Sequence, residues 1–246
     1  MFRIKVNMNP TWDIKDTQNN ILRIYGKDQF EMAKTSFQSV IHRQEYARYH
    51  YHEANKIIDR FLKKEFKTKD AFEITFESSH KKEITFIKVE ANILACLSNM
   101  HAIADIYSYA IYYAFGFNLK TNAIAEHKID TNSVLNIIEN KQEFSSIYKL
   151  LSSIKNEGDF GHLSAVVNHS KHRGVKRLKL SFSQLGMPLE LYSIKIPSYN
   201  YNKKNFPEVE AKQFLESEFN RATKLHIDMG NAINEILAKL PISHNP

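Results

Sequence analysis

Long stretches of the chain repeat apolar residues every three or four positions, which is the spacing of an amphipathic helix. One pattern begins near Asp28 and continues to about Lys67, with an apolar stripe formed by Val40, Ala47, Tyr51, Ala54, Ile58 and Leu62. A second runs from about Glu83 to Phe115, where Gly116 is expected to end the helix. Its predicted core side consists of Phe86, Val89, Ile93, Leu97, Met100, Ala104, Tyr107 and Ile111. The pattern therefore predicts two long helices in the first half of the chain.

Shorter helical patterns follow a predicted loop over residues 117–130. The segment Asp130–Ser133 offers N-cap residues for a helix that ends at Ile138. A further helix is expected from about Glu143 to Lys155, with Ile147, Leu150, Leu151 and Ile154 directed inward. Asp159 is a candidate N-cap for the next one, whose buried side is Phe160, Leu163, Val166 and Val167. The last helix is predicted to start near Pro207 and to run to about Leu240.

Elsewhere the pattern alternates with a period of two, which is typical of strands. It predicts an edge strand at Met1–Asn7, a short strand at Phe72–Phe76 and an antiparallel hairpin between Gly174 and Pro197. The two strands of the hairpin are separated by a five-residue connection that contains Gly186. Residues 199–207 are expected to form an exposed loop.

These elements predict a mainly α fold, an antiparallel bundle of long helices with a β-hairpin insertion near residues 175–197. A hydrophobic content of 43% is ample for one core, and only 7 glycines and 6 prolines disfavour a sandwich or barrel. Since neither composition nor periodicity breaks along the chain, residues 1–246 are predicted to form a single helical domain.

Several classes of function have no support in the sequence. Glycine-rich nucleotide loops, paired Cys-x-x-Cys motifs and His-Glu-x-x-His are absent, so no cofactor is predicted. The single cysteine, Cys96, lies among apolar residues and is expected to pack as a small hydrophobic group. We expect a cytoplasmic protein without a membrane partner, because no signal-like or membrane-spanning apolar run is present.

The chemistry-bearing side chains concentrate in residues 162–174, which hold three of the 11 histidines. Asn168 and His172 are four apart and should share a helix face, with Lys171 and Arg173 beside them. Cationic groups there can polarise a phosphate, and His172 could move a proton during cleavage of an RNA backbone. The alternative is a cationic helix C-terminus that favours the helix dipole. Asn168, Lys171 and His172 are therefore candidate catalytic residues.

A second candidate pair is His101 and Asp105, which are also four apart. An aspartate one turn from a histidine can fix its tautomer and raise its basicity, although such a pair can equally serve only to orient two helices. If the apolar halves of the two helices pack together, His101, Asp105, Asn168 and His172 are expected to share one pocket. No metal is predicted there, although His101, Asp105 and His172 would form a metal site as a minor alternative.

The formal net charge of +7 favours partners that carry phosphate. In a non-catalytic alternative, the chain is a nucleic-acid-binding module in which four cations contact phosphates: Arg173, Lys176, Arg177 and Lys179. A third alternative is an interaction scaffold that forms a homodimer through tyrosine-rich helix faces. These faces carry Tyr46, Tyr49 and Tyr51 on one helix and Tyr107, Tyr109, Tyr112 and Tyr113 on another.

Long helices together with the segment Asn168-His169-Ser170-Lys171-His172 resemble the HEPN class of all-α nucleotide- and RNA-directed domains. The resemblance covers residues 83–173. It implies metal-independent ribonuclease activity on RNA, of the kind found in defence or toxin systems, with His172 in the role of the catalytic histidine. Ribonuclease members carry an arginine and a histidine separated by four residues. Here Asn168 lies one residue nearer to His172 than that arginine would, and Arg173 follows the histidine.

Overall fold

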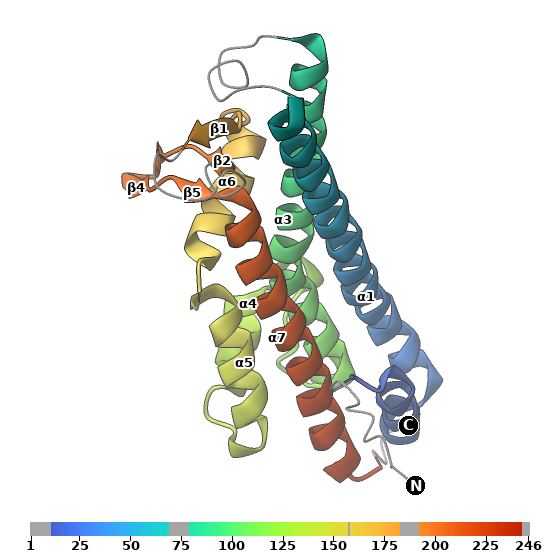
Figure 1. Ribbon diagram of the computed structural model, residues 1–246. Helices are drawn as coiled ribbons and strands as arrows, with labels where there is room; N and C mark the ends of the chain where they lie inside the picture. The colour runs from blue at the N-terminus through green and yellow to red at the C-terminus, as the bar shows by residue number, and fades with distance from the viewer. Residues whose placement is uncertain (1–10, 69–78, 157, 183–191, 243–246) are drawn as a thin grey trace, which may run out of the picture. The chain divides into compact units, whose positions relative to one another are not determined.

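The computed structural model describes residues 11–68, 79–156, 158–182 and 192–242 (Figure 1). The helices are α1 (Ile14–Thr68), α3 (His80–Ala114), α4 (Thr131–Ile138), α5 (Ser145–Asn156), α6 (Phe160–His172) and α7 (Ala211–Lys239). The strands are β1 (Lys179–Phe182), β2 (Tyr192–Ile196), β3 (Tyr199–Tyr201), β4 (Lys204–Phe206) and β5 (Val209–Glu210). The predicted mainly α fold with an antiparallel β-hairpin is confirmed. Within these ranges, no helix combines the length and apolar character needed to cross a bilayer.

The chain divides into two compact units. Unit 1 lies within residues 1–41, 104–155 and 222–246, and unit 2 lies within residues 42–103 and 156–221. Each of the long helices α1, α3 and α7 contributes residues to both units. Organisation as a single domain remains a prediction.

Helix α1 begins earlier than its hydrophobic pattern suggests, at Ile14 rather than near Asp28. The side chain of Asn20, a residue type that often occurs in turns, donates hydrogen bonds of 3.0 Å to the carbonyl and carboxylate oxygens of Asp16 within the helix. The helix is interrupted only at Gly26, whose φ of 82° and ψ of −174° are non-helical. That backbone conformation favours glycine, which lacks the Cβ that makes it costly. The interruption explains why the periodicity appears to start after this residue.

Unit 1 is held together by polar contacts between its helices as well as by its core. Tyr107 of α3 is fully buried, and its hydroxyl lies 2.7 Å from Nδ1 of His226 in α7. Burial raises the pKa of this tyrosine well above its usual value. Gln29 of α1 donates to the side-chain oxygen of Asn118 at 2.7 Å. These paired polar groups fix the relative rotation of the helix segments within unit 1.

In unit 2 the segments of α1 and α3 run antiparallel. The Arg43 guanidinium donates a hydrogen bond of 3.0 Å to the side-chain oxygen of Asn99. Further along α1, Nδ1 of His50 lies 2.9 Å from the side-chain oxygen of Asn92. Between them the thiol of Cys96 donates to the carbonyl oxygen of Ala47 at 3.3 Å. Cys96 is fully buried, and burial raises its thiol pKa to about 12, so it packs as the expected small hydrophobic residue.

The predicted core of the second helix is confirmed, since every residue named for its core side is buried in α3. Asp130 caps α4, as expected, because its carboxylate accepts from the backbone N–H of Ser133. The predicted helix from Glu143 is α5, and the segment before it, Gln142–Phe144, forms a 3-10 turn.

Two small sheets belong to unit 2. Strands β1 and β2 form the predicted hairpin, with Leu180 opposite Ile194, and β5 pairs on the other edge of β2. This third strand displaces the start of the last helix, which was expected near Pro207 and lies at Ala211 instead. Glu210 then caps α7, because its carboxylate accepts from the backbone N–H of Gln213. The predicted strands at 1–7 and 72–76, and the connection around Gly186, lie outside the described residues.

Candidate nucleic-acid interface

Helix α6 carries the histidine-rich segment, and its first turn is fixed by a buried carboxylate. Glu218 of α7 is fully buried and accepts a hydrogen bond of 3.0 Å from the backbone N–H of Asp159. Asp159 occupies the predicted N-cap position, but its side chain makes no capping hydrogen bond. Glu218 therefore satisfies a backbone donor just before α6, where the sequence pointed to Asp159.

The other end of α6 is closed by His169. The backbone N–H groups of Arg173 and Gly174 both donate to the His169 carbonyl oxygen, at 2.9 and 3.0 Å. The ring nitrogen Nδ1 of His169 lies 2.6 Å from the carbonyl oxygen of Gly174. Gly174 has a φ of 138°, which lets the chain leave the helix sharply. His169 therefore has a structural role at the helix end.

Residues 199–207, predicted to be an exposed loop, instead contain a tight hairpin of strands β3 and β4. Asn202 and Lys203 both have positive φ, 49° and 63°, the conformation that a two-residue hairpin turn requires. Tyr199 pairs with Phe206 across the hairpin, and their rings stack at 5.3 Å. Tyr199 is only 5% exposed, so this segment is anchored rather than free in solvent.

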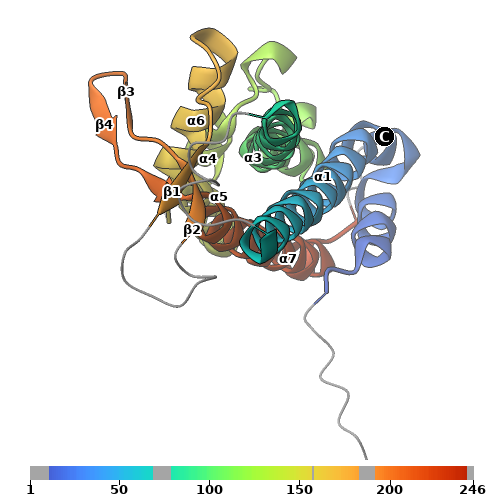
Figure 2. The same ribbon diagram turned by 45° about the horizontal axis from the view of Figure 1, so that its top comes forward.

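The hairpin of β3 and β4 lies beside α6 (Figure 2). Its aromatic side chains contact two histidines of that helix, His162 and His169. The His162 ring lies 5.7 Å from Tyr199, 5.3 Å from Phe206 and 5.0 Å from Phe214. Its Nε2 is buried without a hydrogen-bond partner among the described residues. Burial lowers the pKa of His162, with Asp159 opposing the shift, so the ring is favoured in its neutral form. His162 therefore fixes the hairpin against the helix.

Beyond this contact lies a basic surface formed by the end of α6 and the hairpin turn. Lys171, His172 and Arg173 are exposed at the helix end, and Lys203 and Lys204 are exposed at the turn. The Arg173 guanidinium lies 5.2 Å from the Tyr201 ring centre. The α6–hairpin surface is defined here as Lys171, His172, Arg173, Lys176, Tyr201, Lys203 and Lys204.

Two of the four predicted phosphate-contacting cations are already engaged in ion pairs. Arg177 donates to the buried carboxylate of Glu90 at 3.0 Å. Lys179 and Lys195 both pair with Glu208, and their hydrogen bonds lower the pKa of its carboxyl group. The other two, Arg173 and Lys176, lie over tyrosine rings, with Lys176 5.7 Å from the centre of Tyr199. The charge available to a ligand is therefore on the α6–hairpin surface rather than along β1.

His101 and Asn168 meet at one hydroxyl group. Nε2 of His101 lies 3.1 Å from Oγ of Ser164, and the Asn168 amide donates to that oxygen at 3.2 Å. The His101 ring also stacks on Phe160 at 5.7 Å, with 6° between the planes. Helices α3 and α6 thus bring together one member of each predicted pair, through a serine that the sequence did not single out. His172 lies one turn beyond Asn168 and is exposed.

Asp105 belongs to unit 1, whereas His101 belongs to unit 2. The Asp105 carboxylate accepts a hydrogen bond of 3.1 Å from the hydroxyl of Thr131, the first residue of α4. Orientation of His101 by Asp105 remains a prediction. The described ranges contain no group of three or more His, Cys, Asp or Glu residues arranged to hold a metal ion. The minor metal alternative thus gains no support from those ranges.

The tyrosine-rich faces proposed for a homodimer are buried only in part. Tyr107 and Tyr112 are each 1% exposed, and Tyr51 stacks on Phe219 at 4.4 Å. Tyr46 and Tyr49 do remain exposed on α1.

The sequence missed Tyr199, Tyr201 and the two lysines of the hairpin turn as part of the site. The signal was present, since Tyr199 and Tyr201 alternate with asparagines on one side of Asn202-Lys203 and Phe206 follows on the other. No protein-family model matches the chain, and neither does any curated protein or solved structure.

Proposed function

We propose that this protein binds RNA through the α6–hairpin surface. The observation that carries the proposal is a set of cations without acidic partners: in the described part of the chain, no carboxylate forms an ion pair with Lys171, Arg173, Lys176, Lys203 or Lys204. Unpaired cations gathered at one place attract the closely spaced phosphates of a nucleic acid.

Aromatic side chains support a single-stranded ligand. Tyr201 is half-exposed beside Arg173, and tyrosine rings next to cations provide stacking surfaces for unpaired bases. Because His162 contacts Tyr199 and Phe206, the backbone of the hairpin that carries Tyr201 and the two lysines is fixed against α6 in the absence of a ligand. Such preorganisation lowers the entropy cost of binding.

Neutralising three cations of the surface is expected to weaken RNA binding strongly. The variant Lys171→Gln/Arg173→Gln/Lys176→Gln should bind a labelled single-stranded 12-nucleotide RNA roughly 10- to 100-fold more weakly at low salt. The slope of log affinity against log salt should decrease by about 2, since each lost phosphate contact removes about 0.7. Fluorescence anisotropy measures both quantities.

The matched control is Arg60→Gln/Lys63→Gln/Lys88→Gln, which removes the same charge from exposed positions of α1 and α3 in the same unit. This control should change binding by less than about threefold, since its charges lie outside the site. Equal losses in both triple variants would reduce the proposal to a net-charge effect. Absence of RNA binding by the wild type at low salt would refute the proposal. Tighter binding of DNA than of RNA would refute RNA as the preferred ligand.

A second candidate function, RNA cleavage, is favoured by the exposure of His172 between Lys171 and Arg173. His172 would take the proton of a ribose 2′-hydroxyl, whose oxygen attacks the adjacent phosphorus. The bond to the 5′-oxygen breaks and that oxygen takes a proton from solvent, giving a 2′,3′-cyclic phosphate and a 5′-hydroxyl. Lys171 and Arg173 would stabilise the added negative charge. This is the metal-independent activity that the HEPN resemblance implies.

His172→Ala should abolish such cleavage, with a loss of roughly 10²- to 10⁴-fold. Stability should change by less than about 0.5 kcal/mol, because the side chain is exposed. Formation of cyclic phosphate ends in the presence of EDTA measures the activity, and His127→Ala, another exposed histidine, is the control. Reduced stability with unchanged activity per folded molecule would remove His172 from the reaction. If the wild type binds RNA but does not cleave it, the cleavage function is refuted and only the binding function is retained.

A further inference from the structure

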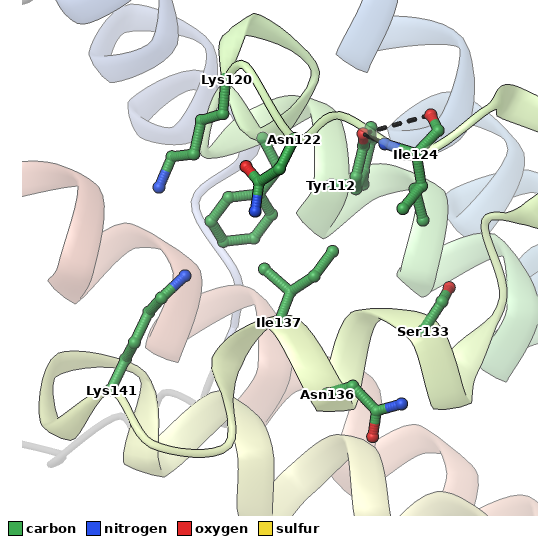
Figure 3. A pocket seen from close by; sticks show the side chains of 9 residues that line it. Tyr112, Lys120, Asn122, Ile124, Ser133, Asn136, Ile137 and Lys141 are labelled. Carbon is green, nitrogen blue, oxygen red and sulfur yellow. Dashed lines mark hydrogen bonds between the residues drawn. The ribbon is translucent and has the colours of Figure 1, made fainter.

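Unit 1 contains a pocket that is lined by none of the residues proposed to bind RNA. Its volume is about 450 Å³, within the range of small-molecule sites. It lies where the turn after α3 faces α4, and Figure 3 shows its side chains. It is lined by Tyr112, Phe117, Lys120, Asn122, Ile124, Ser133, Asn136, Ile137 and Lys141.

Local hydrogen bonds keep the walls of this pocket in place. The Tyr112 hydroxyl accepts from the backbone N–H of Ile124 at 2.9 Å, which holds the segment after α3 against that helix. Gly116 has a φ of 60°, and a Cβ at this position would lie 2.8 Å from the ring of Tyr25. A glycine is therefore required where the chain turns into the pocket wall. On the opposite wall, the Asp130–Ser133 capping box starts α4.

Two lysines share one aromatic ring at the pocket. The Nζ atoms of Lys120 and Lys141 lie 5.0 and 4.9 Å from the ring centre of Phe117, which is itself only 3% exposed. The two side chains come from different segments, and Figure 3 shows their amino groups directed toward the same space. Neither forms an ion pair with a carboxylate in the described ranges.

The positive charges of Lys120 and Lys141 interact electrostatically. Burial and then the charge of Lys120 lower the pKa of Lys141, with Glu143 acting in the opposite sense. Two ammonium groups held together without a counterion repel, and a bound dianion removes that repulsion. The arrangement thus favours a phosphate over a singly charged carboxylate.

We propose that this pocket binds a small organic phosphate of about the size of a nucleoside monophosphate. The phosphate lies between Lys120 and Lys141, and the organic part contacts Ile124 and Ile137. The amide group of Asn122, which Figure 3 shows on the same side as the two lysines, can donate to and accept from polar atoms of the ligand. This site is independent of the α6–hairpin surface, since it shares no residue with it.

Calorimetric titration of the full chain with adenosine 5′-monophosphate tests the proposal, with phenyl phosphate, adenosine and inorganic phosphate as comparison ligands. Saturable binding is expected for adenosine 5′-monophosphate and for phenyl phosphate. Adenosine should bind at least about tenfold more weakly than its monophosphate, because it lacks the charged group. Binding of phenyl phosphate alone would also support an organic phosphate site. Absence of binding for both phosphate esters, or equal binding of adenosine and its monophosphate, would overturn it.

Two variants locate the binding in this pocket. The variant Lys120→Gln/Lys141→Gln should weaken binding by roughly 30-fold or more, because two charge-assisted contacts are lost. The control Lys128→Gln/Lys149→Gln removes the same charge from exposed positions of unit 1 and should have little effect on binding. Ile137→Trp fills the pocket with all charges kept and should also reduce binding. Unchanged affinity in the Lys120/Lys141 variant, with its melting temperature equal to that of the wild type, would refute the site. RNA affinity should remain that of the wild type in all of these variants.

Discussion

Replacing Gly230 of α7 by alanine is expected to destabilise the protein by about 3 kcal/mol, the upper end of the cost of overpacking a core. A Cβ at this position would lie 2.1 Å from Cγ and 2.2 Å from Cδ2 of Trp12. Trp12 cannot easily move aside, because its Nε1 donates to Thr17 at 2.8 Å and its ring contacts Phe37 and His226. The clash therefore outweighs the gain of up to about 1 kcal/mol that alanine normally brings to a helix.

Gly161 of α6 provides the matched control. It is exposed, and a Cβ there would have no atom within 4 Å. Gly161→Ala should therefore leave stability unchanged or raise it by up to about 1 kcal/mol. Urea unfolding followed by circular dichroism measures both variants. If Gly230→Ala were as stable as the wild type, the close packing of Trp12 on α7 would be wrong.

Removal of the Glu218 carboxylate is also expected to lower the stability of unit 2 by several kcal/mol. Glu218 is 0% exposed and receives hydrogen bonds from the Arg221 guanidinium, the shortest 2.7 Å, and from the Asp159 backbone at 3.0 Å. Glu218→Ala leaves a largely buried guanidinium and a backbone donor without this partner, for which a loss of roughly 3–5 kcal/mol is expected. Because the same carboxylate fixes the start of α6, RNA binding should be lost at temperatures where unit 2 unfolds.

Glu218→Gln separates charge from shape. It keeps an oxygen for the Asp159 N–H but loses the charge that pairs with Arg221, so its loss of stability should be smaller than that of the alanine variant. Asp228→Ala, which removes an exposed i,i+4 pair with Lys224 on α7, should cost no more than about 0.5 kcal/mol. Equal effects of Glu218→Ala and Asp228→Ala would show that the buried pair contributes no more than a surface one.

The parts of the fold that the sequence predicted well are those set by local periodicity. The core side of α3 follows from spacing alone, because every third or fourth residue from Phe86 to Ile111 faces the interior. The hairpin of β1 and β2 follows from alternation in the same way. By contrast, the first turns of α1 were missed because asparagine usually favours turns, whereas Asn20 is hydrogen-bonded to Asp16 within the helix.

The candidate site was predicted only in part because its partners are distant in sequence. The cluster at the end of α6 was identified from residue types, but Glu90 neutralises Arg177 from another helix, and no spacing rule reports that pairing. Similarly, the burial of Tyr199 depends on His162. A pattern of polar and aromatic residues therefore resembled a loop until its tertiary contacts were known.

Trp12 is the only tryptophan in the chain, and it lies in unit 1. Its emission consequently reports the integrity of that unit without any label, while α6 and the hairpin of unit 2 are spectroscopically silent in the same experiment. Far-ultraviolet dichroism, in contrast, samples the helices of both units. Superimposable transitions from the two signals define one cooperative domain, and a dichroism change that precedes the shift in tryptophan emission identifies unit 2 as a separately melting part.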